Sequence, residues 1–293
     1  GLTDAQHKDG KNARQVLQWL TDKPNGDKPF FIALGLQKPH VPFLAPDKYF
    51  DLYPFEKITY ETDRPNMWDF LPQSALSKRY EAFGFEFAKE NHALRKEYIQ
   101  AYHACVSFID AQLGLVLDGL KKNGLWDETV IIFTSDHGYH LGDHFIWGKV
   151  TLFDIGAKVP FIVRAPGLTK PGTSSEAMVE LIDIYPTLTD LAGLQAPDHL
   201  QGVSLRPLFE NSERRGKKKY AYSVVTRGPK NLGYALRNQN WRYGKWPDGE
   251  ELYNLRNDPQ EKNNLAQKDH IKERLEEFRS ILQEKQKLIE KSN

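Results

Sequence analysis

The sequence predicts a larger α/β domain, residues 1–205, followed by a smaller α+β domain, residues 206–293. In the first part, apolar runs typical of buried strands alternate with patterns typical of helices, as they do in α/β domains. In the second part, short alternating runs separated by turn residues precede one polar helix, which indicates an antiparallel sheet closed by a helix. A chain of 293 residues has enough material for a core in each part.

The first predicted helix and strand lie within residues 12–36. Residues 12–20 carry apolar side chains at helical spacing, and the turn sequence Pro-Asn-Gly at 24–26 ends the helix. Residues 29–36 (PFFIALGL) form an apolar run that predicts a buried strand. Residues 41–91 are rich in proline and aromatic side chains and predict a long irregular segment, either functional or a surface excursion packed by its own rings.

The longest helical pattern covers residues 92–123 and stops at Gly124. Its apolar face includes Cys105, the single cysteine of the chain, so the sequence allows no internal disulfide. We interpret Cys105 as a small core residue rather than a nucleophile, because buried thiols in apolar surroundings are inert.

Three further elements and a linker complete the larger domain and lead into the smaller one. Strands are predicted at 129–134 and 159–164, and a helix at 183–191 is stopped by a glycine. The basic run at 214–219 (RRGKKK) lies in a linker-like stretch and predicts a solvated loop.

The smaller domain is predicted to contain four short strands and a closing helix. The strands alternate apolar and polar residues between turn signals, at 220–225, 233–237, 241–243 and 251–253. The helix, residues 268–287, is polar with one apolar stripe.

Two titratable residues follow the strand at 129–134. Asp136 and His137 provide a carboxylate and an imidazole side by side, which suits a divalent metal if other segments complete the coordination shell. The pair could instead only cap the next turn. On residue types alone the metal stays open among zinc, manganese, calcium and magnesium.

Lys149, Lys38 and His40 are further charged or proton-carrying residues near predicted strand ends. A lysine can bind one oxygen of a sulfate or phosphate, and a histidine can protonate a leaving oxygen near neutral pH. Together with a metal they would form a pocket for a tetrahedral anionic ester. Taken singly, each such residue is more often an ordinary surface residue.

The overall composition limits the partners. A net charge of +1 gives no reason to expect nucleic acid or an anionic membrane, and no apolar run approaches the roughly 20 residues of a membrane helix. The first residue is Gly1 rather than methionine, and no signal peptide is visible, so the sequence does not disclose the compartment.

Six collinear blocks resemble the type I sulfatases of the alkaline-phosphatase superfamily, most closely the iduronate-2-sulfatase-like branch. The resemblance covers nearly the whole chain, and six blocks in order are far more specific than any one motif. The blocks are PFFIALGLQKPHVPFLAPDKYFDLYP, IIFTSDHGYHLGDHFIWGKVTLFD, VPFIVRAPG, ELIDIYPTLTDLAGL, GYALRNQNWRY and ELYNLRNDPQEKNNLA.

The resemblance implies an alkaline-phosphatase-like sandwich and a calcium ion with Asp136 and His137 as two of its ligands. It also implies that Lys149 contacts the sulfate and that His40 lies near the ester oxygen. The implied substrate is a sulfated sugar, a glycosaminoglycan or another sulfate ester.

Two further residues match family positions at the rim of the pocket: Lys38 and His144, which the resemblance assigns to substrate binding. The block at 233–243 resembles the part of the smaller domain that helps to shape the substrate side. By family resemblance the compartment is periplasmic, secreted or lysosomal.

The chain departs from the family pattern in two respects. Type I sulfatases carry two adjacent aspartates after their first strand, and a C/S-x-P-x-R element whose Cys or Ser becomes the formylglycine nucleophile. Neither is present: Cys105 is followed by Val-Ser-Phe, and no serine fits the element either. We therefore expect a C-terminal portion of a sulfatase whose nucleophile and first strands lie in an N-terminal segment or in a separate chain that completes the domain.

Three functions remain open on this reading. The leading one is a sulfuric ester hydrolase in which this chain alone is inactive. The second is a phosphoryl or phosphonate ester hydrolase of the same superfamily, although Lys149 in its Trp-Gly-Lys element favours the sulfatase. The third is a non-catalytic remnant that binds an anion or a partner chain.

Overall fold

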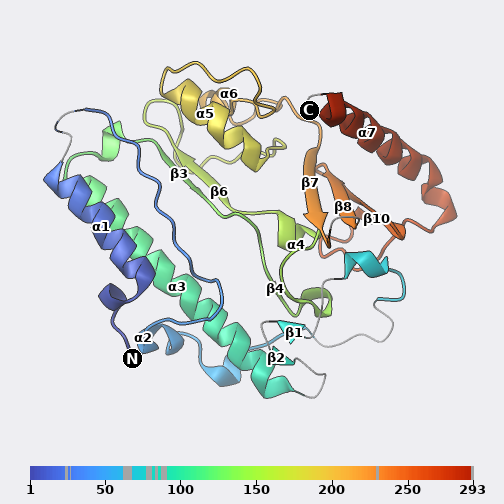
Figure 1. Ribbon diagram of the computed structural model, residues 1–293, viewed down its shortest axis with the longest axis horizontal. Helices are drawn as coiled ribbons and strands as arrows, with labels where there is room; N and C mark the ends of the chain where they lie inside the picture. Colours follow the sequence, from blue (N-terminus) through green and yellow to red (C-terminus); the bar gives the residue numbers. More distant parts are fainter. Residues whose placement is uncertain are drawn as a thin grey trace. The chain divides into compact units, whose positions relative to one another are not determined.

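The computed structural model describes residues 1–23, 26, 28–61, 68–76, 81–82, 85–86, 91–228 and 231–291 (Figure 1). The chain divides into two compact units that interleave along the sequence. Unit 1 comprises Gly1–Asp63, Tyr80–Thr129 and Leu141–Trp147, and unit 2 comprises Arg64–Arg79, Val130–His140 and Gly148–Asn293. Two short strands, β4 (His140–Leu141) and β5 (Trp147–Gly148), lie where the chain passes between the units.

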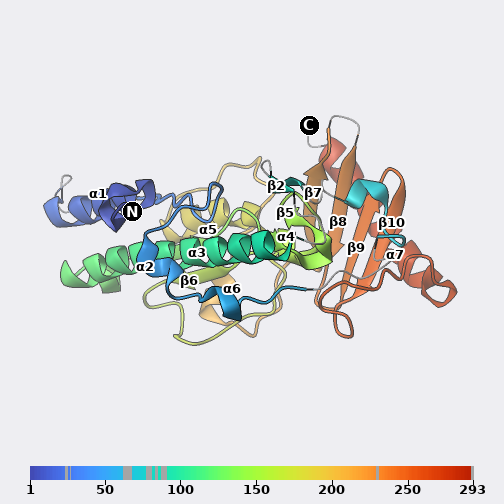
Figure 2. The same cartoon turned by 90° about the horizontal axis from the view of Figure 1, so that it is seen from below.

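Two helices form the frame of unit 1. Helices α1 (Lys8–Asp22) and α3 (His92–Lys122) lie side by side (Figure 2), which confirms both helices expected from the sequence. The Asn91 side chain caps α3 by accepting a hydrogen bond from the backbone N–H of Leu94 at 3.2 Å. A Cβ at Gly119 would lie 2.5 Å from Leu17 Cδ1, so the glycine permits the close approach of the two helices.

The predicted irregular segment at 41–91 contains several short elements within the described residues. Tyr49 packs against Ala104 and Phe108 of α3, so part of this segment is anchored by its own aromatic rings. The short elements of unit 1 are η1 (Asp4–Gln6), α2 (Asp47–Phe50), η2 (Phe55–Lys57), β1 (Glu81–Ala82), β2 (Phe85–Glu86), η4 (Trp126–Glu128) and η5 (Asp143–Phe145). Residues 62–67, 77–80, 83–84 and 87–90 of the segment lie outside the described residues.

The core position of Cys105 is confirmed. Its side chain is fully buried in α3, and burial raises the pKa of the thiol to about 11. The thiol is therefore protonated at neutral pH, which makes it a poor nucleophile.

The prediction of a buried strand at 29–36 is wrong. No residue of this segment is in a strand, although residues 31–38 alternate between exposed and partly buried as an extended chain does. The segment is tied to α1 through the Asn12 side chain, which donates to the Gly35 carbonyl at 3.0 Å. A strand is defined by a ladder of hydrogen bonds to a neighbouring strand, and none of the described residues forms such a ladder with this segment. The segment is also not buried throughout, since Phe31 is 77% exposed.

The first part of unit 2 is built around an antiparallel strand pair. Strand β3 (Ile131–Thr134) pairs with β6 (Phe161–Arg164), with Ile131 opposite Arg164. These strands and α5 (Ile184–Leu191) confirm three elements expected from the sequence. The remaining short elements of unit 2 are η3 (Gln73–Ala75), α4 (Asp154–Ala157), η6 (Leu181–Asp183), α6 (Arg206–Glu210) and η7 (Asp269–Ile271).

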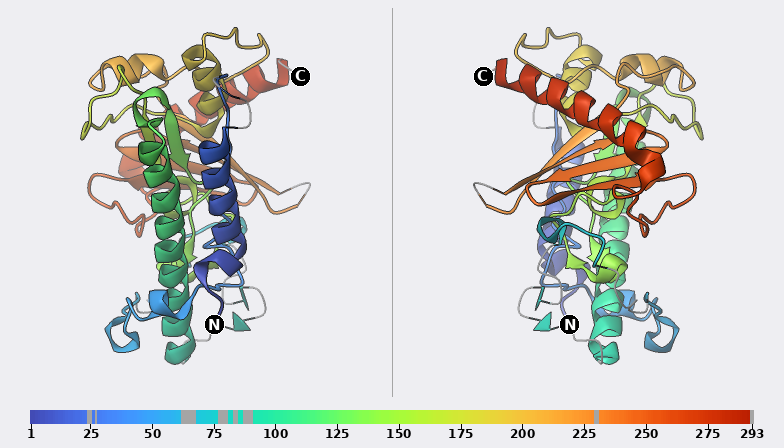
Figure 3. Two further views of the ribbon diagram at one scale, coloured as in Figure 1. Left: turned by 90° about the vertical axis from the view of Figure 1, so that its left-hand side faces the viewer. Right: turned by 90° about the vertical axis from the view of Figure 1, so that its right-hand side faces the viewer.

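The rest of unit 2 is a four-stranded antiparallel sheet with a helix across one face, as Figure 3 shows. Strand order is β10-β9-β8-β7, and the core between sheet and helix is formed by Leu236, Tyr243, Leu252, Leu275, Phe278 and Leu282. The strands and the helix expected in the smaller domain are thus confirmed. They are β7 (Ala221–Thr226), β8 (Leu232–Arg237), β9 (Trp241–Trp246), β10 (Gly249–Asn254) and α7 (Lys272–Lys291).

By length and composition alone, α3 could cross a membrane, and it is the one such helix within the described ranges. The sequence-based expectation that no apolar run approaches the length of a membrane helix therefore needs this exception. A core helix of a soluble protein meets the same criteria, and Ala104, Cys105 and Phe108 of α3 are fully buried.

An ion pair fastens α7 to the sheet. Glu250 accepts hydrogen bonds from the Arg279 guanidinium, at 2.9 Å from Nε, and from the Tyr243 hydroxyl at 2.6 Å. The hydrogen bonds from Arg279, and then that from Tyr243, lower the pKa of the Glu250 carboxyl from 4.5 to about 2. The ionised carboxylate is therefore favoured in the folded state.

The ion pair of Glu250 and Arg279 predicts that the free energy of unfolding decreases in acid. Because the folded-state pKa lies below the unfolded value, the stabilisation is present above pH 4.5 and is lost as the pH falls towards 2. We expect a loss of about 1–2 kcal/mol, because solvent screens the Arg279 side chain, which is 37% exposed. Urea unfolding at pH 6 and pH 3 should show a smaller pH effect in Glu250→Gln than in the wild type; equal effects would remove Glu250 from this role.

A buried charge network lies on the other side of the same sheet region. Arg242 of β9, 1% exposed, pairs with Glu251 of β10 and with Glu261. Its guanidinium also lies 4.8 Å from the ring centroid of Phe153 and 4.6 Å from that of Tyr253. Burial alone would lower the pKa of Arg242, but the two glutamates raise it, so the guanidinium stays charged.

Candidate functional site

The turn after β3 brings a carboxylate and an imidazole nitrogen together. His137 Nδ1 lies 2.8 Å from the Gly138 carbonyl, which can only accept, so Nδ1 is the donor in this contact. Nε2 lies 3.5 Å from Asp136 Oδ2, and the Asp136 side chain is 84% exposed. A carboxylate oxygen and an imidazole nitrogen, both side-chain groups that divalent metals bind, thus lie next to each other on partly exposed side chains.

The chain turns there because a glycine allows a very close contact with a second loop. A Cβ at Gly138 would lie 1.9 Å from the carbonyl oxygen of Ile155, so no larger residue fits. The Gly138 N–H donates to the Gly156 carbonyl at 2.9 Å. The turn that carries Asp136 and His137 is therefore hydrogen-bonded to the short helix α4, residues 154–157.

A second tie joins the same two segments. His140, which is fully buried, lies 2.7 Å from the hydroxyl of Thr151, which is 2% exposed. Thr151 follows the partly exposed Lys149 by two residues, and the intervening Val150 adopts a left-handed φ of 68°. A β-branched residue in that conformation is strained, so the surrounding contacts must hold the backbone beside Lys149 in place.

The C-terminal sheet anchors the far end of this loop. Asp154 accepts from Arg237 of β8 at 3.1 Å, and its backbone N–H donates to the carboxylate of Glu261 at 2.6 Å. Glu261 in turn pairs with the buried Arg242. The loop that carries Lys149 is thus held by the Asp136 turn on one side and by the sheet on the other.

Lys38 and His40 lie together in unit 1, at the end of the extended segment. The buried Asp9 accepts the backbone N–H groups of Gln37 and Lys38 at 2.8 and 2.9 Å, which fixes the chain where it leaves that segment. The Lys38 ammonium donates to the carbonyl of His40 at 3.1 Å and to that of Pro42. The His40 ring lies at the exposed end of this turn, with Nδ1 2.7 Å from the Val41 carbonyl.

His144 also belongs to unit 1 and is only 5% exposed. It has a left-handed φ of 55°, follows Gly142 with φ 108° and precedes Phe145 with φ 56°. His144 and Phe145, two successive non-glycine residues with positive φ, make a strained turn, and strain of this kind clusters at functional segments.

The structure thus brings part of the predicted site together. Asp136, His137 and the loop of Lys149 are joined within unit 2, whereas Lys38, His40 and His144 belong to unit 1. Among the described residues, no group of three or more histidine, cysteine, aspartate or glutamate side chains could hold a metal ion.

Sequence reasoning missed the residues that position the site. His140, Thr151, Asp154 and Glu261 hold the Lys149 loop, but their contacts join positions 11 and 107 residues apart. The available signal was the polar pair His140 and Thr151 within the largely apolar stretch HLGDHFIWGKVTLF.

Comparison with known families gives two matches. The Sulfatase family profile matches residues 3–194, and the profile described as N-sulphoglucosamine sulphohydrolase, C-terminal, matches residues 142–288. The first covers more than half of the chain and includes all six predicted site residues.

Curated relatives are sulfatases as well. A sulfatase of Formosa agariphila is 37% identical over 92% of this chain, and the human iduronate 2-sulfatase is 29% identical over 88%. The chain spans 52% of the length of the first and 62% of the second. These relatives confirm the resemblance to the iduronate-2-sulfatase-like branch.

Solved structures confirm the fold class. A structure in complex with its substrate D-glucosamine-2-N,6-O-disulfate matches 96% of this chain and 69% of its own with a TM-score of 0.80 at 22% identity. The phosphonate monoester hydrolase of Agrobacterium radiobacter matches 97% and 61% with a TM-score of 0.83 at 25% identity. With the family profile covering residues 3–194, these matches identify the chain as a member of the sulfatase family.

Proposed function

We propose that this chain forms one wall of the active site of a sulfuric ester hydrolase that acts on a sulfated sugar, including those of glycosaminoglycans. The proposal rests mainly on two hydrogen-bond contacts, Gly138 with Gly156 and His140 with Thr151. They hold the Asp136–His137 turn and the Lys149 loop together. The named relatives, an iduronate 2-sulfatase among them, support the choice of ester.

In this proposal the chain stabilises negative charge on the sulfate. Lys149 offers a compact positive charge to a sulfate oxygen, and its loop is held in advance, which is the arrangement that stabilises developing charge most strongly. Asp136 and His137 would hold a calcium ion, which when bound withdraws charge from the same oxygens. We assign protonation of the leaving alcohol to His40, and substrate contacts to Lys38 and His144, from the resemblance alone.

We place the nucleophile outside these 293 residues, because the sequence contains no C/S-x-P-x-R element. A formylglycine would then be supplied by a further segment or by a separate N-terminal chain. We also propose the division of the chain at residues 205 and 206 into part of the catalytic domain and a smaller C-terminal domain.

The test is turnover of an aryl sulfate by this chain alone and by this chain combined with a segment that carries the formylglycine. We expect activity only in the combined sample. Turnover by the isolated chain would overturn the placement of the nucleophile, and no turnover in a correctly assembled sample would leave the non-catalytic, anion- or partner-binding reading.

A phosphonate ester hydrolase is the second candidate, because the Agrobacterium radiobacter enzyme shares the fold with a TM-score of 0.83. The two candidates are separated by comparing kcat/KM for an aryl sulfate and for a phenylphosphonate monoester. A ratio in favour of the phosphonate would reverse the assignment.

Asp136→Asn is expected to reduce the calcium content of the combined sample. The amide keeps the size of the side chain but removes the negative charge that a hard cation prefers. Elemental analysis after dialysis measures the effect, with Asp198→Asn as a control at an exposed aspartate outside the turn. Stoichiometric calcium in Asp136→Asn would contradict the ligand role.

A further inference from the structure

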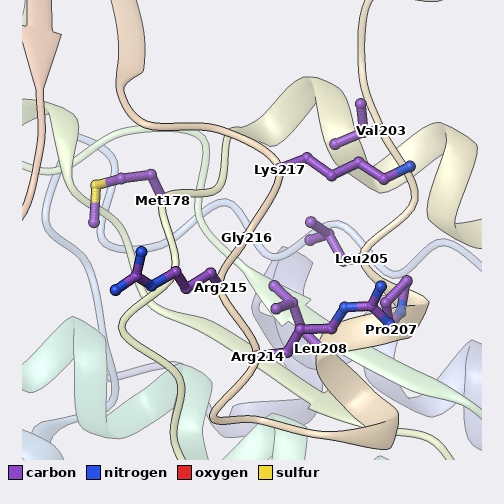
Figure 4. Close-up of a pocket in the computed structure, with 9 residues that line it drawn as sticks. All are labelled: Met178, Val203, Leu205, Pro207, Leu208, Arg214, Arg215, Gly216 and Lys217. Carbon is purple, nitrogen blue, oxygen red and sulfur yellow. The ribbon is translucent and has the colours of Figure 1, made fainter.

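A hollow in unit 2 lies beneath the basic run at 214–219. Its cavity volume is about 90 Å³, within a wider space of about 450 Å³ that is partly open to solvent. Five apolar side chains line it (Figure 4), and we call them its floor: Met178, Val203, Leu205, Pro207 and Leu208. Its edge is formed by Arg214, Arg215 and Lys217, which we call the basic rim.

One lysine of the run is not part of the rim, which corrects the expectation of a wholly solvated loop. Lys218 turns inward, with its side chain 14% exposed, and pairs with Glu180 and with the fully buried Asp183, at 2.6 Å from the latter. Its backbone also forms a β-bridge with Met178. Lys218 therefore pins the loop to the body of the unit, and a charge run alone could not reveal this.

Pinning Lys218 inward leaves the rim outside. Arg214, Arg215 and Lys217 are all exposed. In Figure 4, Arg214 and Lys217 extend toward the side of Pro207 and Val203, whereas Arg215 extends toward the side of Met178. The three cations thus spread over both sides of one apolar floor.

The rim carries positive charge that nearby carboxylates do not neutralise. Glu180 and Asp183 form ion pairs with Lys218. Asp190 and Glu210 form ion pairs with Arg206. In the part of the chain that the structure describes, none of the three rim residues forms an ion pair within 4.0 Å. The residues from 211 to 219 include five basic side chains and one acidic side chain, Glu213.

We propose that the basic rim and its floor form a binding site for a sulfated polysaccharide chain, built from residues other than those of the Asp136 turn and the Lys149 loop. Arginine and lysine pair with sulfate and carboxylate groups, while an apolar floor suits the C–H faces of sugar rings. None of the nine lining residues is aromatic, so the site offers no stacking platform to bases or to sugar rings, and recognition there would rest mainly on the charged groups of the chain.

The choice of a glycan rests on the proposed function, because the same polymer would then be held at two places. A second attachment raises the local concentration of the chain at the hydrolytic site without any new contact there. The site therefore predicts a preference for polymeric over monomeric substrates.

The test is binding of heparin to the full chain by isothermal titration calorimetry, at salt concentrations from 50 to about 200 mM, a range over which polyanion binding changes strongly. The triple variant Arg214→Ala/Arg215→Ala/Lys217→Ala is expected to bind at least tenfold more weakly. Its dependence of log K on log salt should also flatten by about two to three, because each lost cation removes nearly one released counterion. The matched control removes three exposed lysines elsewhere, Lys11→Ala/Lys158→Ala/Lys170→Ala.

Two results would overturn the proposal: unchanged affinity in the rim variant, or an equal loss in the control variant, which would mean that only net charge matters. Duplex DNA or anionic phospholipid vesicles that bind the rim as tightly as heparin would overturn the assignment to a glycan. Circular dichroism of both variants checks the fold. Binding is measured without turnover, so a chain that binds heparin at the rim but never supports hydrolysis would sink the proposed function and leave this inference standing.

Discussion

Lys149→Ala is expected to lower kcat for an aryl sulfate by about 10²–10³ in the combined sample, which corresponds to about 3–4 kcal/mol. The reason is that a positive charge held in advance toward the sulfate stabilises the transition state more than the ground state. The expectation is supported by the anchoring of the loop that carries Lys149, through Thr151 to His140 and through Asp154 to the sheet.

The kinetic parameters separate this role from simple binding. A lysine that only attracts the substrate would raise KM and leave kcat unchanged, whereas we expect kcat to carry most of the loss. Lys149→Arg should recover part of the rate, since it restores charge with a different shape. Lys158→Ala removes an exposed lysine from the end of the same loop and should leave the rate unchanged; a wild-type rate in Lys149→Ala would take Lys149 out of the site.

Elements with local signals could be predicted from the sequence. The apolar stripes of α1 and α3 and the alternation in β7–β10 depend on neighbours within a few residues, and all of these elements are confirmed. The segment at 29–36 failed because an apolar run shows that a segment can be a strand, whereas the ladder depends on partners far away in sequence.

In the candidate site too, some features are visible in the local sequence, whereas others depend on contacts that only the fold provides. The adjacency of Asp136 and His137 is already in the sequence, and the structure adds the orientation of Nε2 toward the carboxylate. The residues that hold the Lys149 loop could not be predicted, because Thr151 and Glu261 act through contacts set by the fold. In the basic run, sequence could not tell the inward Lys218 from its outward neighbours, because charge alone does not specify direction.

Arg242→Ala is expected to destabilise the protein by about 3–5 kcal/mol. The substitution leaves Glu251 and Glu261, 1% and 2% exposed, without their cation, and an uncompensated buried charge is costly. It also removes the contacts of the guanidinium with the rings of Phe153 and Tyr253. Urea unfolding followed by circular dichroism measures the loss, with Lys272→Ala as the control, because its pair with Asp269 is highly exposed and worth less than about 1 kcal/mol.

A triple variant decides whether the network stabilises the fold or positions the loop. Replacing Arg242, Glu251 and Glu261 together by methionine removes every buried charge of the network, so we expect most of the lost stability to return. The backbone N–H of Asp154 would still lack its acceptor, the Glu261 carboxylate, and its hydrogen exchange should therefore be faster than in the wild type. Recovery of stability with fast exchange at residue 154 would show that Glu261 is retained to hold the Lys149 loop. Wild-type exchange there would reduce Glu261 to a partner of Arg242, and a triple variant as unstable as Arg242→Ala would show that packing, rather than charge, sets the cost.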